Sequence, residues 1–293
     1  MSDQQNPVTR YPQPPFTPQP QSFPGLSAKM TPEPDYGERS YKGSGKLSGK
    51  VALITGADSG IGRAVAVAYA LEGADLALSF LEEESEDAEA AARFVRETGR
   101  RVLLLPGDIA DPAVCRSLVE KTLAEFGRLD ILVNNAAFQQ THQSLEEIPD
   151  EEWRRTFDVN IHAMFYITKT ALPHLKPGSS VINTSSVNSK HPMPSLIPYS
   201  ATKASIANFT ISLAQGVAEK GIRVNAVLPG PIWTPFIVTG MEPEQQKSFG
   251  SQAPIGRPGQ PAELAGAYVY LASDENSYTT GALLPVHGGM AIY

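Results

Sequence analysis

The sequence predicts a single α/β domain built on a doubly wound, seven-stranded parallel sheet with helices on both faces. Two observations lead to this prediction. Short, mostly apolar segments alternate along the chain with longer segments of helical periodicity, and continuous apolar strands are typical of sheets covered on both faces. A glycine-rich turn also stands between the first apolar segment and the helix that follows it.

Composition narrows the class of protein. With 293 residues, 41% of them hydrophobic, the chain can bury one large core. A net charge of −7 argues against a nucleic-acid surface. The sequence contains no run of 18 apolar residues, so we expect no membrane span. The single cysteine, Cys115, and the absence of a secretory segment favour a cytoplasmic protein. The five histidines show no metal-ligand spacing, so we expect no metal site.

Residues 1–46 are expected to form a Pro- and Gln-rich extended arm, and residues 47–293 the catalytic domain. The arm shows no periodic apolar pattern, and its composition favours extended or polyproline II conformations. Four aromatic residues are spaced along it: Phe16, Phe23, Tyr36 and Tyr41. Two outcomes stay open, since the arm can lie against the body or a neighbouring subunit, or form a disordered tail. We expect it to supply no group of the functional site.

The remaining elements follow in a regular order. The expected strands are residues 51–55, 75–80, 101–105, 130–134, 180–185, 223–228 and 282–286. The expected helices are residues 63–71, 84–98, 112–126, 151–174, 197–219 and 261–271. The helix of residues 112–126 is expected to begin with Asp111 as its cap and Pro112 at its first position. Ligands of such a sheet bind at the carboxyl ends of the strands, where nearly every polar motif of this chain falls.

The first such motif is the turn with Gly56, Gly60 and Gly62, spaced G-x-x-x-G-x-G. Glycines allow a tight turn and a close approach of the backbone to a pyrophosphate, and the start of the next helix favours negative charge. The position between a buried strand and a helix indicates nucleotide binding. The alternative is a purely structural turn between strand and helix.

The second motif is Tyr199 with Lys203 four residues later, read together with Ser186 thirteen residues upstream of the tyrosine. Residues at i and i+4 share one helix face, so both side chains can act on one small volume. A nearby ammonium favours the phenolate, and we therefore expect Lys203 to lower the pKa of Tyr199 toward the working range. Taken alone, the pair also fits an ordinary amphipathic helix.

Together these motifs resemble the short-chain dehydrogenase/reductase family over about residues 47–290, which implies a Rossmann-type sheet. The matching elements are Thr55 to Gly62 as T-G-x-x-x-G-x-G, Asp108, Asn134 to Ala137 as N-N-A-G with alanine in the last place, Asn160, Ser186, Tyr199 with Lys203, and Pro229-Gly230. The Pro-rich arm and the motif sequences T-G-A-D-S-G-I-G and N-N-A-A-F-Q resemble those of the glucose/ribitol dehydrogenase-like, or general stress, oxidoreductases.

The resemblance implies hydride transfer between a nicotinamide cofactor and a carbonyl or alcohol, with Tyr199 as the acid/base. Lys203 would hold the cofactor ribose and lower the tyrosine pKa, Ser186 would bind the substrate oxygen, and Asn160 would steady a water. In isolation, Asn160 also fits a solvated polar residue and Asp108 a helix cap. Ser185 is the rival of Ser186, but alternation turns the two to opposite sides.

Further site residues follow from the same resemblance. The implied cofactor-binding residues are Gly56, Ser59, Gly60, Ile61, Gly62, Ser79, Phe80, Asp108, Ile109, Asn135, Ala136, Pro229, Gly230 and Ile232, besides Tyr199 and Lys203. Candidate substrate contacts are Gln139, His191 and Trp233, besides Ser186. Residues 232–251, rich in Pro, Gly and Met, suit a mobile lid.

Cofactor preference is decided where the second strand ends. Phe80 stands where the family's NAD enzymes carry an acidic residue, so no carboxylate at this position repels a 2′-phosphate. Yet no basic residue attracts one, and Glu82 to Glu84 follow closely. We expect both NADP and NAD to be accepted, with a slight lean to NADP because Ser79 can donate a hydrogen bond to the phosphate.

The expected function is therefore an oxidoreductase acting on a sugar, a polyol or a small aldehyde or ketone. One alternative is a nucleotide-binding sensor without turnover, and another is a reductase of fatty-acyl or steroid-like ketones. The resemblance also implies a homotetramer that packs through the helices of residues 151–174 and 197–219. From the charge and the lack of a long apolar run, we expect no nucleic-acid or membrane partner.

Overall fold

The computed structural model describes residues 5–291 and contains one seven-stranded sheet, ordered β3-β2-β1-β4-β5-β6-β7. Every neighbouring pair of strands is parallel, so the expected doubly wound sheet is confirmed. The strands are β1 (Val51–Thr55), β2 (Asp75–Phe80), β3 (Val102–Pro106), β4 (Ile131–Asn134), β5 (Ser180–Thr184), β6 (Arg223–Pro229) and β7 (Leu283–Val286).

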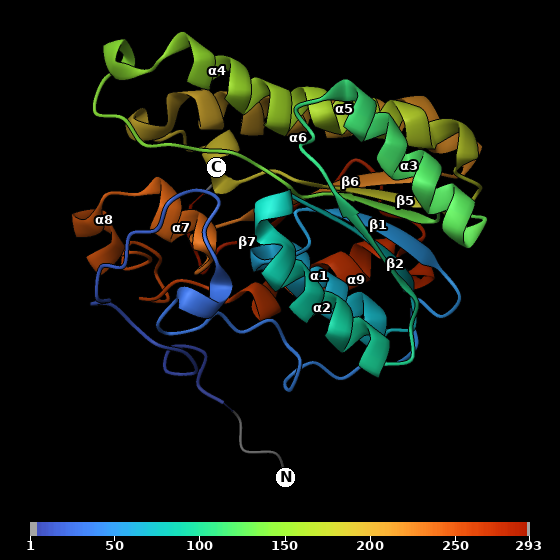
Figure 1. The fold of residues 1–293 in the computed structure, drawn as a ribbon, viewed down its shortest axis with the longest axis horizontal. Helices are drawn as coiled ribbons and strands as arrows, with labels where there is room; N and C mark the ends of the chain where they lie inside the picture. The colour runs from blue at the N-terminus through green and yellow to red at the C-terminus, as the bar shows by residue number, and fades with distance from the viewer. Residues whose placement is uncertain (1–4, 292–293) are drawn as a thin grey trace.

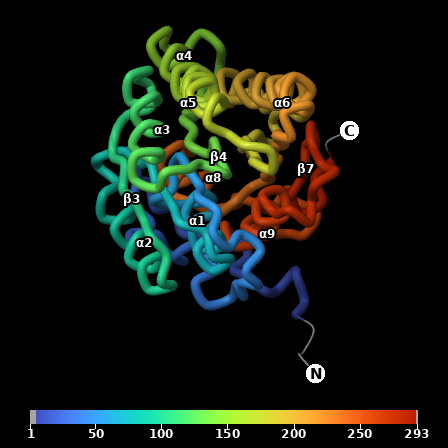
Figure 2. The backbone as a smooth tube through the Cα atoms, turned by 90° about the vertical axis from the view of Figure 1, so that its right-hand side faces the viewer, coloured from blue at the N-terminus to red at the C-terminus, as the bar shows by residue number. Residues whose placement is uncertain are grey.

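Two layers of helices cover the sheet (Figures 1 and 2). One layer holds α1 (Gly60–Leu71), α2 (Ser85–Glu97) and α9 (Pro261–Ala272). The other holds α3 (Pro112–Phe126), α4 (Asp150–Phe157), α5 (Ala163–Ala171) and α6 (Ile197–Val217). The short helices α7 (Pro235–Gly240) and α8 (Pro243–Lys247) lie beyond the end of the sheet.

Side-chain alternation along the strands builds two cores. In β1, Ile54 packs into the cluster under α1 and α9, while its neighbour Leu53 packs into the cluster under α3 and α5. Both side chains are fully buried. Because successive residues of a strand face opposite sides, an apolar strand supplies both cores at once.

The expected long helix of residues 151–174 contains an irregular turn. The chain is helical from α4 through α5, but residues 158–162 form a wide π-turn, and Leu172–His174 tighten into a 3₁₀ turn. Insertion of a residue into the helix rotates the side chains of that turn, and such turns are frequent at functional sites. This π-turn carries Asn160, which it directs into the protein interior.

The strand order reverses between β1 and β4, which are hydrogen-bonded neighbours. From this line the chain winds toward β3 on one side and toward β7 on the other, so the connecting loops diverge at the carboxyl ends of β1 and β4. A crevice at such a switch in strand order is the ligand-binding place of open α/β sheets.

The described part of the arm packs against the body. The ring of Tyr36 is buried, with its hydroxyl 2.6 Å from Ser27 Oγ and the guanidinium of Arg63 over the ring. The carboxylate of Glu72, after α1, accepts hydrogen bonds from the Tyr41 hydroxyl at 2.6 Å and from the Lys46 amide at 2.9 Å. Of the two outcomes left open by the sequence, the structure has the packed arm.

Within residues 5–291, none of the helices combines the length and the apolar character that crossing a bilayer requires.

Candidate active site

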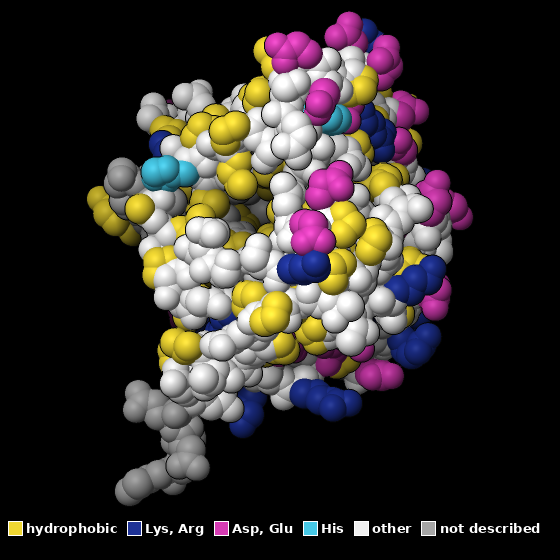
Figure 3. All heavy atoms as spheres, turned by 90° about the vertical axis from the view of Figure 1, so that its left-hand side faces the viewer, with side chains coloured by type: hydrophobic (Ala, Val, Ile, Leu, Met, Phe, Trp, Pro, Cys, Tyr) yellow, Lys and Arg dark blue, Asp and Glu magenta, His cyan; other side chains and the backbone are white. Residues whose placement is uncertain are grey.

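A cavity of about 840 Å³ opens at the carboxyl ends of the strands. Its walls come from the glycine turn, the ends of β2, β4, β5 and β6, the start of α6 and the segment of residues 229–252. The face that carries α7 and α8 is hollowed there, and hydrophobic side chains surround the hollow (Figure 3). The volume lies in the range of small-molecule and cofactor sites.

The glycine turn has the backbone that close contact with a ligand requires. Gly56 and Gly60 line the cavity with φ of +60° and +52°, a region that glycine adopts without strain. Gly62 does not line the cavity. A Cβ there would lie 1.8 Å from the Gly56 carbonyl oxygen, so this glycine allows helix α1 to pack against the turn. The first amides of α1 have no partners within the helix and can bind a phosphate.

The end of β4 is tied to this turn. Thr55 Oγ1 accepts hydrogen bonds from the amides of Asn135 at 2.9 Å and Ala136 at 3.1 Å. In return, Asn135 Nδ2 donates to the carbonyl oxygens of Thr55 and Gly56, both at 3.1 Å. Asn135 and Ala136 line the cavity, as expected. These four hydrogen bonds hold the loop after β4 against the glycine turn, which are the two loops expected to contact the cofactor.

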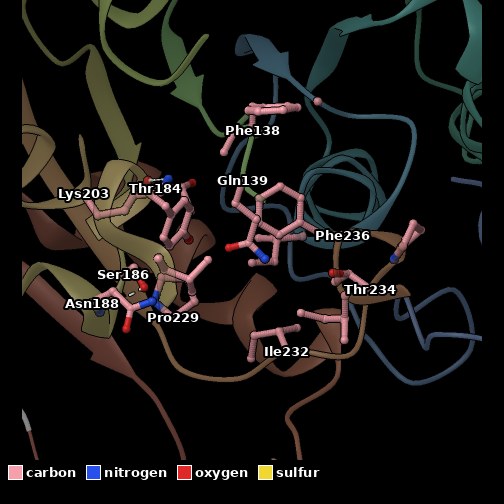
Figure 4. A pocket seen from close by; sticks show the side chains of 18 of the residues that line it. Phe138, Gln139, Thr184, Ser186, Asn188, Lys203, Pro229, Ile232, Thr234 and Phe236 are labelled. Atoms are coloured by element: carbon pink, nitrogen blue, oxygen red, sulfur yellow. Dashed lines mark hydrogen bonds between the residues drawn. The ribbon is translucent and has the colours of Figure 1, made fainter. Parts of the chain in front are cut away.

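Tyr199, Lys203 and Ser186 come together at one wall of the cavity. Lys203 Nζ lies 5.2 Å from the centre of the Tyr199 ring and donates to the Thr184 carbonyl oxygen at 2.9 Å. In Figure 4, Lys203, Thr184 and Ser186 lie on one side of the pocket, Thr234 and Phe236 lie on the other, and Gln139 projects between them. Helix α6 thus presents the tyrosine and the lysine as the sequence spacing predicts.

Burial changes the acid–base properties of this pair. It raises the pKa of the Tyr199 hydroxyl to about 12, and a hydrogen bond with Ser186 lowers that pKa only in part. Burial also lowers the pKa of the Lys203 ammonium to about 7. Burial therefore opposes the lowering of the tyrosine pKa that is expected from Lys203. The dry surroundings that disfavour the phenolate also disfavour the positive charge of the lysine.

The two serines after β5 have different partners. Ser185 Oγ donates to the Lys203 carbonyl oxygen at 2.8 Å and so fixes helix α6 against the strand. Ser186 Oγ accepts from the Asn188 amide at 3.1 Å and also bonds the Tyr199 hydroxyl. The arrangement favours Ser186 as the serine that can meet a substrate oxygen.

Asn160 lies behind the cavity wall and is almost fully buried. Its Nδ2 donates to the Phe138 carbonyl oxygen and to Thr202 Oγ1, both at 3.0 Å, and its Oδ1 accepts from the Phe138 amide at 2.7 Å. Both amide protons are used, so Asn160 links the loop after β4 to helix α6. Its side-chain oxygen Oδ1 has a second lone pair, which can still accept a hydrogen bond from a water.

The expected cofactor residues at the far end of the cavity are in place. Ser79, Phe80, Asp108 and Ile109 all line it, and the Asp108 carboxylate is held by Arg155 Nη1 at 2.6 Å. The lining also includes Ser59 and Ile61 of the glycine turn, and Pro229, Gly230 and Ile232 at and after the end of β6.

Two carboxyl groups that the sequence left unplaced join this end of the cavity. Asp58 and Glu84 both line it, and Asp58 Oδ2 is buried without a hydrogen-bond partner. Burial raises the pKa of Asp58 to about 6. Burial and the nearby Asp58 charge raise the pKa of Glu84 to about 8. Phe80 itself brings no carboxylate, but Asp58 and the expected neighbour Glu84 place two carboxyl groups at this end of the cavity.

Of the candidate substrate contacts, Gln139 and His191 line the cavity and Trp233 does not. The Trp233 side chain is fully buried, its ring stacks on Phe16 of the arm at 4.4 Å, and its Nε1 donates to the Pro32 carbonyl oxygen. The prediction that Trp233 contacts substrate is thus corrected, because its ring is a packing element beneath the arm.

Other lining residues escaped the sequence analysis. Phe236 and Met241 come from the segment predicted as a lid, and their positions could have been found from that prediction. Phe23 and Pro24 come from the arm, which was expected to supply no site group, so that expectation is wrong. No local signal could have found them, because more than a hundred residues separate Phe23 from its ring partner Phe138.

The donor set at the cavity fits a dinucleotide. Across residues 5–291, no group of three or more His, Cys, Asp or Glu side chains could hold a metal ion. The glycine cradle, the free amides of α1 and the polar groups of β2 and β4 instead match the phosphates, riboses and base of a nicotinamide cofactor.

Comparisons with known proteins agree with this geometry. A family model described as enoyl-(acyl carrier protein) reductase matches residues 56–291. General stress protein 39 of Bacillus subtilis (strain 168) is 52% identical over 266 residues, which cover 91% of this chain and 93% of that protein. The chloroplastic NADPH-dependent aldehyde reductase 1 of Arabidopsis thaliana is 44% identical over 275 residues, with coverages of 92% and 96%.

A solved structure gives the same result. The crystal structure of L-sorbose reductase from Gluconobacter frateurii, complexed with NADPH and L-sorbose, matches with a TM-score of 0.76 at 33% identity. The match covers 83% of this chain and 97% of that one. The fold and the site define an NAD(P)-dependent oxidoreductase. The chain belongs to the short-chain dehydrogenase/reductase family, and its expected similarity to the general stress oxidoreductases is confirmed.

The lowered pKa of Lys203 predicts a pH-dependent stability. Between pH 7 and 10.5 the unfolded chain holds a proton on this lysine that the folded protein has lost, so the lysine's contribution to stability rises with pH. Relative to Lys203→Met, the unfolding free energy of the wild type should rise by about 2 kcal/mol between pH 7 and pH 9. Urea unfolding at both pH values measures this difference. Lys190→Met, at an exposed lysine, is the control, and an equal response of both variants would contradict the prediction.

Proposed function

We propose that the protein reduces the carbonyl group of a small polar compound, such as a sugar, an aldehyde or a ketone, with NADP(H) as the preferred cofactor and Tyr199 as the proton donor. The observation that carries this proposal is the convergence of Tyr199, Lys203 and Ser186 on the cavity that the glycine turn also lines. A sensor without turnover would not need these three groups at one wall.

The roles of the side chains follow from their chemistry. A bound nicotinamide would supply the hydride. Ser186 and Tyr199 would both donate hydrogen bonds to the substrate oxygen, which stabilises the negative charge that grows there. Tyr199 would then release its proton to that oxygen. Lys203 would bind the cofactor ribose, and its charge would increase the acidity of the tyrosine.

The pKa of Tyr199 supports the reductive direction. With a pKa of about 12, the hydroxyl keeps its proton at neutral pH and is ready to act as an acid. The reverse reaction needs the phenolate, which burial disfavours. Alcohol oxidation should therefore gain more from alkaline pH than carbonyl reduction does.

Two features support a polar substrate, and one supports an alternative. Gln139 and His191 can bind hydroxyl groups, and the similar proteins include an L-sorbose reductase and an aldehyde reductase. The lid side of the cavity is apolar, with Ile232, Phe236 and Met241, and this favours fatty-acyl or steroid-like ketones as the second candidate. A panel of sugars, short aldehydes and long-chain ketones, run with NADPH and with NADH, decides between them.

We also propose a homotetramer in a reducing cytoplasm. Helices α4, α5 and α6 expose large apolar side chains, with Trp153 at 40%, Phe165 at 43% and Ile211 at 38% exposure. Such side chains on neighbouring helices support a face that packs against another copy. The single cysteine, Cys115, is a buried free thiol, which supports a location in the reducing cytoplasm. Cell fractionation tests this location.

The tetramer prediction is tested by light scattering after gel filtration. The wild type should have four times the mass of the 31.5 kDa chain, and Phe165→Asp should dissociate it because a charge would be buried at the interface. A monomeric wild type would contradict the proposal.

The acid role of Tyr199 is tested by Tyr199→Phe. This change keeps the ring but removes the proton, so turnover should fall by at least ~10²-fold while NADPH affinity stays nearly constant. Steady-state kinetics and fluorescence titration measure the two quantities. Tyr278→Phe, at a fully exposed tyrosine, is the matched control. Near-normal turnover of Tyr199→Phe would sink the mechanism.

The cofactor preference should depend on pH through Glu84 and Asp58. As pH rises from 6 to 8 these groups gain negative charge and repel a 2′-phosphate, so kcat/KM for NADPH relative to NADH should fall. Glu84→Gln should raise this ratio at pH 8 by roughly fivefold, equivalent to about 1 kcal/mol. Glu83→Gln, at an exposed neighbour, should leave it unchanged. Equal ratios for Glu84→Gln and the wild type would show that the 2′-phosphate lies elsewhere.

A further inference from the structure

The arm reaches the cavity through contacts that the family motifs do not involve. Its residues run beside α7 and α8, the two short helices of the predicted lid (Figure 1). Phe16 and Met30 of the arm form a buried cluster with Trp233 and Val238 of the lid. The rings of Phe16 and Trp233 stack with centres 4.4 Å apart. The arm and the lid thus share a small hydrophobic core of their own.

Backbone hydrogen bonds add to this core. The Phe16 amide donates to the Lys247 carbonyl oxygen and the Gln21 amide to the Val238 carbonyl oxygen, both at 3.0 Å. The Gln19 amide donates at 2.9 Å to Oε1 of Gln246, a fully buried side chain. Bonds at both α7 and α8 fix the arm along the length of the lid. Movement of the lid must therefore break these bonds or carry the arm with it.

Beyond these bonds, the arm crosses to the other side of the cavity. Phe23 and Pro24 line the cavity, and the ring of Phe23 meets the ring of Phe138 edge to face at 5.4 Å. Phe138 follows β4, and its backbone is held by Asn160. The arm therefore connects the lid with the fixed edge of the sheet across the mouth of the cavity.

A purely structural role accounts for the later part of the arm, but it does not account for the contacts of residues 16–25. Met30 and Pro32 still contact Trp233, but from Tyr36 onward the arm is anchored on the body, through Arg63 of α1 over the Tyr36 ring and through the Glu72 carboxylate. The contacts of residues 16–25 given above fall instead on the lid and on Phe138. Even Gly25 lies against the lid, since a Cβ there would meet Thr239 Cγ2 at 2.6 Å.

We propose that residues 16–25 form a strap that retains the bound nicotinamide nucleotide: Phe16 positions the lid through Trp233, and Phe23 closes the cavity against Phe138. This inference rests on the proposed function, because it assumes that a nicotinamide nucleotide occupies the cavity. Exchange of the nucleotide requires the lid to open. The strap adds a stacked ring pair, an edge-to-face ring pair and backbone hydrogen bonds to the contacts that opening must break.

The experiment measures release of NADPH from the full-length protein by stopped-flow fluorescence, with excess NADP⁺ as the competitor. Phe16→Ala and Phe23→Ala should each speed release by at least ~10-fold. Val8→Ala, at another exposed apolar side chain of the arm, should release NADPH at the wild-type rate. Phe23 is 40% exposed, so Phe23→Ala stays folded even if Phe16→Ala does not.

A double-mutant cycle separates the strap from general loosening. If Phe23 acts through Phe138, Phe23→Ala combined with Phe138→Ala should speed release no more than the faster single variant does. Multiplicative effects would contradict a joint role. Thermal unfolding of each variant provides the second readout, because a structural arm would lower the melting temperature without changing release from the folded protein.

The outcomes for the two proposals differ. Wild-type binding of NADPH with release unchanged in both single variants overturns the strap and leaves the proposed function intact. Binding of neither NADPH nor NADH by the wild type overturns both. Faster release in both single variants, with Tyr199→Phe still inactive and still retaining NADPH, supports both.

Discussion

The site depends on the hydrogen bonds that join the ends of β1 and β4. Thr55 accepts from the amides after β4, and Asn135 returns two bonds to the glycine turn. These strands are neighbours only because the strand order reverses between them, so the same topology that opens the crevice brings its two edges within bonding reach. Asn160 then continues the connection from the β4 loop to helix α6, which carries Tyr199 and Lys203. One polar network thus connects the glycine turn with the helix that carries Tyr199 and Lys203.

Burial sets the chemistry at the end of this network. The phenol of Tyr199 and the ammonium of Lys203 both lose water, and each shifts toward its neutral form. The lysine is held through Thr184 on one side and, through its carbonyl oxygen, by Ser185 on the other. Hydrogen bonds to uncharged groups therefore fix the position of Lys203, while the charge of its amine can still change. A group whose pKa lies near 7 responds strongly to any ligand that changes its surroundings.

Contiguous patterns predicted most of the fold and the three candidate residues that meet at one wall of the cavity. The strands are apolar runs, and Tyr199, Lys203 and Ser186 follow from short spacings, so both could be inferred without tertiary information. What failed depended on distant contacts. Trp233 reads as an exposed lid residue until Phe16, more than two hundred residues away, covers it. The effect of burial on the pKa of Tyr199 could not be predicted, because the spacing locates a charge but does not reveal how much water surrounds the phenol.

The proposed strap gives a function to an arm that has no periodic structure. Tyr199 and Lys203 stand on the long helix α6, and Ser186 follows directly after β5, so regular elements hold their geometry. Helices α7 and α8, by contrast, have 6 and 5 residues and are too short to be stable as isolated helices. Contacts from the arm give these helices a second layer, centred on Phe16 and Trp233. Because the arm is anchored further on at Tyr36 and Glu72, its contacts with the lid can break and form again without the arm leaving the protein.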